Sequence, residues 1–189
     1  MRLLHTLAVL ALFCFALAIA GCKSLEINDS DSFDTAKKGI IEVRVTDAPP
    51  EYDLASIDIV FSTVEIHKTG DGEGEGGWIQ IPVVNGQLDL IELDNLDLEE
   101  LLATELVTPG TYNQLRVIID TISVTLAGDG DAPYVFIPSG ELKFNQHFLV
   151  LDDIATILLL DFDASESMVV TGSGRIIFSP VVHLSVNQE

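Results

Sequence analysis

Two aspartates at the end of an apolar run are the residues of this chain whose types and spacing most directly suggest chemistry. Asp161 and Asp163 lie in the segment "LLLDFDASES", where Leu158, Leu160 and Phe162 form the predicted core face and leave both aspartates outside. Residues two apart in a strand project from one face, roughly 6.5 to 7 Å apart along the chain. Glycosidases use two carboxylates at similar separations. Nothing nearby indicates a sugar cleft, and any strand that ends in solvent offers the same spacing.

A hard cation is a better functional interpretation of these aspartates than catalysis. Calcium takes six to eight oxygen ligands, and carboxylates supply them. Asp47 ends the first predicted strand just before two prolines, so Asp47, Asp161 and Asp163 could converge on Ca²⁺ if their strand ends meet at one pole. The alternative is turn chemistry alone, with Asp47 in an Asx-turn and Asp163 capping the turn at "ASES".

The remaining candidates for chemistry are weaker. His67, His147 and His183 fall in different predicted strands and lack the His-Glu-x-x-His motif of a zinc enzyme. A hydrolase built on these histidines together with the aspartates is therefore a minor alternative. Trp78 could contribute to a carbohydrate platform, but core packing is the default expectation for a chain with 7% aromatic residues. We expect no catalytic residue and no bound organic cofactor.

Charge limits the partners of the protein. The 189 residues carry 9 Lys and Arg against 30 Asp and Glu, which gives a net charge of −21. Such a surface repels nucleic-acid phosphates and anionic lipid headgroups, so we expect no nucleic-acid partner. It attracts cations and basic patches of other proteins. The hydrophobic content of 48% is enough to form a core.

The N-terminal residues are typical of an exported lipoprotein. "MRLLHTLAVLALFCFALAIAGC" begins with a basic residue and continues with an apolar run that is short for a membrane span. Its end, "IAGC", resembles the bacterial lipobox, so we expect residues 1–21 to be a signal peptide and Cys22 to carry lipid. The lipid would hold the protein to a membrane.

The next residues predict a tether and limit what cysteine chemistry can contribute. Residues 22–38 are polar after Cys22 and would span roughly 20 to 25 Å as a flexible coil. Lys23 stands where an aspartate would indicate retention in the inner membrane, so the outer membrane is favoured, on its periplasmic or outer face. Cys14 and Cys22 are the two cysteines of the chain, which leaves residues 39–189 without a disulfide, thiol nucleophile or thiolate metal site.

Residues 39–189 alternate apolar and polar positions and predict one antiparallel β-sandwich. Ile41, Val43 and Val45 share one face, and the alternation changes register between Phe61 and Val64, which predicts a bulge. Gly-rich turns separate the strands, and the turn "VNGQ" is expected to join two of them. The segment 96–106, "LDLEELLATEL", has leucines at helical spacing and a possible capping box, so it predicts a short surface helix.

A series of segments resembles a family of secreted bacterial and archaeal proteins catalogued as domain of unknown function 4382. The resemblance covers residues 39–186 and implies a transthyretin-like or prealbumin-like sandwich in proteins that are commonly lipoproteins. It carries over no catalytic or ligand residue. "PGTY" is also similar to an element of carboxypeptidase regulatory-like domains, in which the tyrosine packs at a strand start. The matching segments are "VTDAP", "VEIH", "GW", "DLIEL", "PGTYNQLRVIID", "VFIPSG", "LKF", "LLLDFDASESMV" and "PVVHL".

These observations together predict a lipid-anchored envelope protein that acts as a non-catalytic binding, adhesion or accessory module, with Ca²⁺ as its candidate cofactor. The partner would be an envelope protein or a glycan, and the membrane is contacted through the N-terminal lipid. A purely structural lipoprotein is the first alternative, and an envelope hydrolase is the second.

Overall fold

The computed structural model describes residues 37–48, 53–70, 76–128, 135–136, 139–173 and 176–189. Contacts between Cα atoms divide the chain into two units, Met1–Thr35 and Ala36–Glu189. The expected signal peptide, the lipidated Cys22 and most of the tether lie outside the described residues, so these expectations stay predictions. No helix among the described residues is long and apolar enough to cross a membrane.

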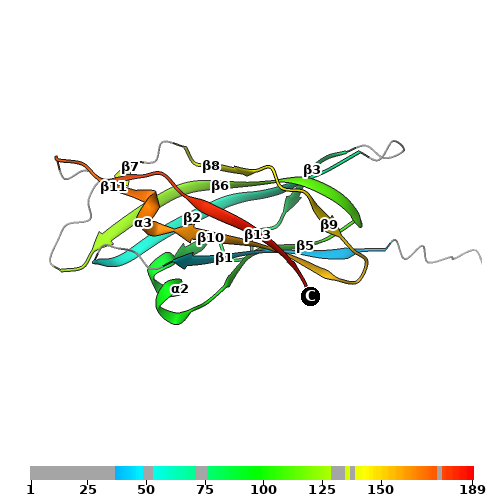
Figure 1. Ribbon diagram of the computed structural model, residues 1–189, viewed down its shortest axis with the longest axis horizontal. Helices are drawn as coiled ribbons and strands as arrows, with labels where there is room; N and C mark the ends of the chain where they lie inside the picture. The colour runs from blue at the N-terminus through cyan, green and yellow to red at the C-terminus, as the bar shows by residue number, and fades with distance from the viewer. Residues whose placement is uncertain (1–36, 49–52, 71–75, 129–134, 137–138, 174–175) are drawn as a thin grey trace, which may run out of the picture. The chain divides into compact units, whose positions relative to one another are not determined.

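Two main sheets form a sandwich within the second unit, as the alternating sequence predicts (Figure 1). The first sheet has the strand order β13-β10-β1-β5. Its two central strands, β1 and β10, run parallel, and the other neighbours are antiparallel. The sandwich is thus not purely antiparallel, and the chain between β1 and β10, which passes through both main sheets, provides the long crossover that a parallel pair requires. The bounds are β1 Gly39–Ala48, β5 Glu100–Val107, β10 Ala155–Asp163 and β13 Val182–Gln188.

The second sheet is centred on the two longest strands, β2 and β6, which pair antiparallel over nearly their full length. The strand order is β3-β2-β6-β8, with β4 also paired to β2 and β9 to β6. A small third sheet has the order β11-β12-β7. The bounds are β2 Leu54–Lys68, β3 Gly77–Ile81, β4 Gln87–Asp89, β6 Gly110–Leu126, β7 Val135–Phe136, β8 Glu141–Phe144, β9 Phe148–Val150, β11 Met168–Val170 and β12 Ile176–Phe178.

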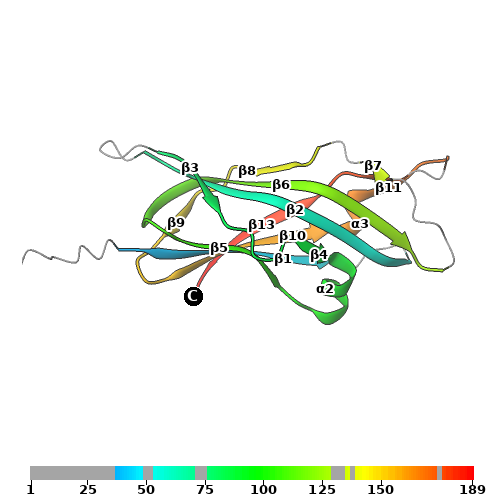
Figure 2. The ribbon, with the colours of Figure 1, turned by 180° about the vertical axis from the view of Figure 1, so that it is seen from behind.

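The expected bulge in β2 is confirmed, but the turn "VNGQ" does not close a hairpin. The register between β2 and β6 shifts on both sides of Phe61, where the alternation of the sequence changes. On the other edge of β2, β3 pairs with Val64–Lys68 and β4 with Asp58–Val60. Figure 2 shows β3 and β4 at different positions along the same strand. The residues between them bridge to the first sheet, where Val83 pairs with Ala103.

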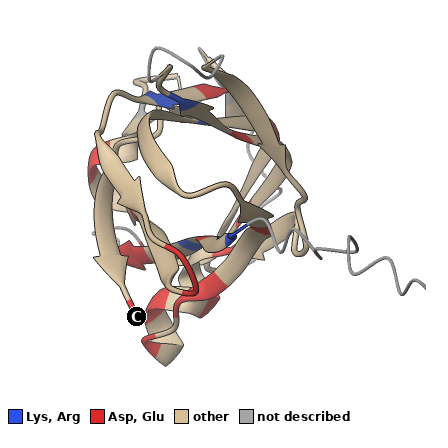
Figure 3. Ribbon diagram, turned by 90° about the vertical axis from the view of Figure 1, so that its right-hand side faces the viewer, with Lys and Arg blue, Asp and Glu red and all other residues tan. Residues whose placement is uncertain are grey.

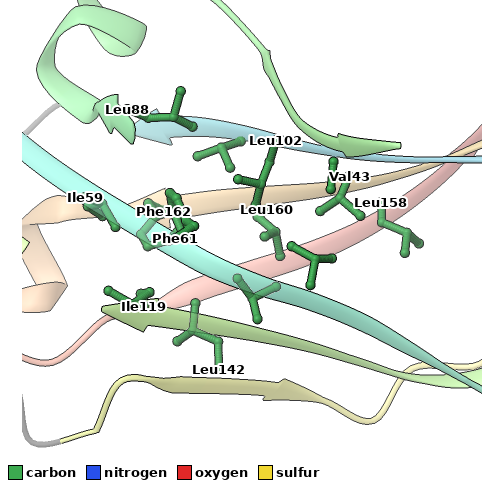
Figure 4. Close-up of a cluster of buried hydrophobic side chains, with 14 of the residues drawn as sticks. Val43, Ile59, Phe61, Leu88, Leu102, Ile119, Leu142, Leu158, Leu160 and Phe162 are labelled. Carbon is green, nitrogen blue, oxygen red and sulfur yellow. The ribbon is translucent and has the colours of Figure 1, made fainter. Parts of the chain in front are cut away.

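The core lies between the two main sheets and is made from the inward positions that the period of two predicts. Val43, Leu158 and Phe162 from the first sheet are fully buried, and they face Ile59 and Phe61 of β2 (Figure 4). The rings of Phe61 and Phe162 meet edge to face with centroids 6.2 Å apart. The predicted core face of the "LLLDFD" segment is therefore confirmed.

The helix expected at residues 96–106 is wrong, because most of that segment is β5. The described residues form two helices instead, α2 over Leu90–Leu96 and α3 over Ala164–Ser167. Asp89 caps α2, and Asp97 ends it in a left-handed conformation with φ of 51°. The following strand pairs with β1 and buries Leu102 and Ala103, so sheet pairing overrides the helical spacing of the leucines.

Tyr112 packs at the start of β6, as the "PGTY" element implies. Its side chain is fully buried, and its ring stacks on Phe148 at 5.5 Å with an interplanar angle of 10°. Its hydroxyl donates to the carbonyl oxygen of Thr108 at 2.7 Å. Burial raises the pKa of the phenol above its usual value. The residue thus closes the end of the core and satisfies its one polar group.

Candidate functional site

The structure does not bring the three aspartates of the expected calcium site together. In the parallel pairing of β1 with β10, Asp47 lies opposite Phe162, and Thr46 lies opposite Asp161. Asp47 is therefore on the buried face of the sheet, at 8% exposure, while Asp161 and Asp163 project from the other face. Within the described ranges no group of three or more His, Cys, Asp or Glu side chains could hold a metal ion.

Asp163 has a structural role that the sequence allowed. Its carboxylate accepts a hydrogen bond from the backbone N–H of Glu166 at 2.9 Å and caps α3. This is the capping of "ASES" that competes with the cation interpretation. Asp161 is the cross-strand neighbour of His183, yet no hydrogen bond or ion pair joins these two described residues. The pair therefore lacks the base–orienter contact that a hydrolase of this type would use.

His67 and Trp78 belong to a polar cluster on the outer face of the second sheet. Nδ1 of His67 is 2.9 Å from the amide oxygen of Asn113, and its ring meets the edge of Trp78. The guanidinium of Arg116 lies 4.2 Å from the centroid of the Trp78 ring, and the ammonium of Lys143 lies 5.9 Å from it. Trp78 is 37% exposed, so the expectation of core packing is wrong for this residue.

A pocket that no sequence motif indicated lies where α2 and β4 meet the start of β5. Its volume is about 220 Å³. Its polar walls consist of three carboxylates and two carboxamides, and the side chains of three leucines complete the lining. The polar residues are Asp89, Glu92, Glu100, Asn85 and Gln87, and the leucines are Leu88, Leu93 and Leu98. We call this feature the acidic pocket.

Hydrogen bonds to neighbouring elements hold the walls of the acidic pocket in place. Oδ1 of Asp89 accepts from the backbone N–H of Ile57 at 3.0 Å and from that of Ile91 at 3.1 Å, which fixes the start of α2 against β2. The amide of Asn85 donates to Oε1 of Glu100 at 3.0 Å. A helix, two strands and these bonds therefore hold the pocket walls through contacts within the protein itself.

The other end of the acidic pocket is fixed by the turn that follows α2. The backbone N–H of Leu98 donates to the carbonyl oxygen of Leu93 at 3.0 Å, and the hydroxyl of Thr46 donates to the carbonyl oxygen of Leu98 at 3.1 Å. The side chain of Leu98 nevertheless remains 42% exposed. Two neighbouring apolar side chains are also exposed. Val84, which precedes Asn85 of the pocket, is 56% exposed, and Leu96, the last residue of α2, is 57% exposed. Apolar surface therefore adjoins the pocket.

Acidic residues predominate in the part of the chain that forms the acidic pocket. The sequence contains no Lys or Arg between Lys68 and Arg116. Figure 3 shows Asp and Glu gathered on and beside α2. Glu99, which directly precedes Glu100 of the pocket, forms an ion pair with Arg44. The distance from a guanidinium nitrogen of Arg44 to the Glu99 carboxylate is 3.5 Å. The carboxylate of Glu92 forms no hydrogen bond or ion pair with any described residue. Its charge is available to a ligand.

Comparison with known proteins identifies the domain without assigning it an activity. A family model described as "Domain of unknown function (DUF4382)" matches residues 38–180. No curated protein matches the chain. No solved structure matches it either. The match covers both main sheets up to the start of β13 and includes the whole acidic pocket.

Proposed function

Since the chain belongs to the family described as a domain of unknown function (DUF4382), we propose its function from the site itself. The protein is a lipid-anchored module of the bacterial envelope that binds a partner protein and catalyses no reaction. The acidic pocket is the observation that carries this proposal, because it combines a preformed cavity, an uncompensated negative charge and adjoining apolar side chains.

A lipid anchor and a tether suit a binding module of this kind. The lipobox supports attachment at Cys22, and the polar residues up to Lys38 would let the domain extend roughly 20 to 25 Å from a membrane. Negative charge on the domain favours separation from anionic headgroups. The pocket would then be presented to other envelope proteins.

The lipid anchor is tested by feeding the host an alkyne-tagged fatty acid. The wild-type protein should incorporate the tag, and the Cys22→Ser variant should not. If neither protein carries the tag, or if both carry it equally, the anchor is placed wrongly.

Binding through the pocket is tested by site-directed photocrosslinking in intact cells. A photoreactive phenylalanine analogue replaces Leu98 in the pocket lining, and a matched variant carries it at Leu149 on β9, where the side chain is 48% exposed. We expect a discrete adduct of higher mass from position 98 and none at that mass from position 149. Absence of an adduct at position 98, or the same adducts from both positions, would refute a binding role for the pocket.

A further inference from the structure

We infer that the acidic pocket receives a lysine or arginine side chain from the partner protein, an inference that rests on the function proposed above. The pocket volume of about 220 Å³ lies below the range of roughly 300 to 1,000 Å³ typical of small-molecule sites. The space therefore suits one side chain better than a whole cofactor or drug-sized substrate.

The chemistry of the walls selects a cation that donates several hydrogen bonds. Three residues with carboxylates line one small cavity, and none of the described residues that line it is basic. The hydrogen bonds that Asp89 accepts come from neutral backbone amides, and the one that Glu100 accepts comes from a neutral carboxamide, so none of these donors is a basic side chain. Lysine and arginine carry three and five N–H donors, respectively, and no acceptor, which matches the carboxylate oxygens of the walls.

The apolar part of the pocket fits the stem of the same side chains. Lysine and arginine bury their methylene groups along apolar surface and keep the charged group among polar atoms. Leu93 and Leu98 supply such a surface beside Glu92. The exposed side chains of Val84 and Leu96 extend it beyond the pocket, where apolar neighbours of the basic residue would pack. A bare metal ion uses none of this apolar lining.

Charge complementarity identifies the occupant as a protein other than a second copy of this chain. A net charge of −21 makes two copies repel one another. A basic segment of another protein is attracted over the whole approach and is then fixed by the pocket. Long-range attraction alone would not distinguish the pocket from the rest of the acidic surface, so the test must locate the ligand.

The test uses short photoreactive peptides and the full chain purified in detergent. Each peptide carries a diazirine-bearing leucine next to one variable residue. In the first pair of peptides this residue is arginine or its neutral isostere citrulline. In the second pair it is lysine or N-acetyl-lysine. Labelling is carried out at about 0.15 M salt, where attraction beyond roughly 8 Å is screened. Trypsin cuts after Lys68 and Arg116 and releases residues 69–116, which contain the entire pocket, as one fragment. Mass spectrometry then measures the labelling of each fragment.

We expect at least one charged probe to label residues 69–116 about threefold to fivefold more than its neutral counterpart, as for one partly exposed ion pair. Glu92→Gln should bring that ratio close to one. Glu166→Gln removes an exposed charge of α3 and should leave the ratio unchanged. Equal labelling by charged and neutral probes, or a charge preference spread evenly over all acidic fragments, would overturn the inference.

The two proposals fail in different ways. If position 98 forms a specific adduct in cells but the probes show no preference for charge, the pocket binds a partner by other chemistry. If the probes prefer charge at the pocket but no adduct forms in cells, the pocket accepts basic side chains and the proposed function is refuted.

Discussion

Replacement of Asp89 by alanine should destabilise the domain through two backbone groups at once. Its Oδ1 accepts hydrogen bonds from the backbone N–H of Ile91, at the first turn of α2, and from that of Ile57, near the start of β2. Alanine removes the one acceptor atom that both N–H groups share. The start of α2 would then lose its side-chain connection to β2, while β4 stays paired with β2, and the acidic pocket would lose one carboxylate.

The magnitude follows from these two bonds. Loss of an N-cap acceptor costs about 1 kcal/mol. A buried backbone N–H that loses its partner costs about 1 to 3 kcal/mol, and Ile57 is fully buried. We therefore expect Asp89→Ala to lower the free energy of unfolding by about 2 to 4 kcal/mol. For a domain of this size that corresponds to a decrease in Tm of roughly 4 to 16 °C.

Urea unfolding followed by circular dichroism measures this effect, with two controls. Asp89→Asn keeps an Oδ1 acceptor and should cost about 1 kcal/mol or less. Glu92→Ala removes an exposed carboxylate from the same helix without removing a hydrogen bond, and should change stability by less than about 0.5 kcal/mol. If Asp89→Ala were as stable as Asp89→Asn, the two hydrogen bonds would not support the structure as described.

Three further predictions concern other parts of the molecule. Tyr112→Phe should cost about 1 kcal/mol because it removes the hydrogen bond to Thr108. Burial raises the pKa of Tyr112 in the folded state above the usual value of about 10. The contribution of its neutral phenol to stability is therefore complete below pH 10 and is lost as the pH rises through the raised pKa. The free energy of unfolding, measured from pH 8 to 11, should decrease less in Tyr112→Phe than in the wild type. Calcium and magnesium at equal ionic strength should raise Tm equally, because Asp47 faces away from Asp161 and Asp163; a calcium-specific rise abolished by Asp161→Asn would contradict this. Trp78→Ala should lower stability by about 1 kcal/mol, because the contact with Arg116 is lost, and Lys143→Gln by less; equal stability of wild type and Trp78→Ala would show that the contact contributes nothing.

The strands could be predicted from the sequence because a period of two reports directly on burial. Ile41, Val43 and Val45 were placed on one face by alternation alone, and all are fully buried. The same alternation puts Asp47 on that face too. Convergence of Asp47 with Asp161 and Asp163 therefore depended on how β1 and β10 pair, and the parallel register places the latter two on the opposite face. Alternation within one strand cannot supply that register.

The acidic pocket could not be predicted because its walls include β4 of one sheet and β5 of the other, which come together only in the folded sandwich. Leu98 and Leu102 have the spacing of a helix and were assigned to one, yet burial of Leu102 against β1 favours a strand. The true helix begins directly after Asp89, a residue type that favours the N-cap, and this was the local signal that went unused. The absence of Lys and Arg between residues 68 and 116 was a second signal, visible in the sequence but without meaning until the pocket was located.

The most direct test of the account is the photocrosslinking yield at position 98 in cells that carry one additional substitution. With Glu92→Gln the adduct at position 98 should fall about threefold to fivefold, because the free carboxylate of the pocket is lost. With Glu166→Gln, which removes one exposed charge from α3, the yield should equal that of the unsubstituted protein. The same yield in both backgrounds would contradict recognition of a basic partner by the acidic pocket.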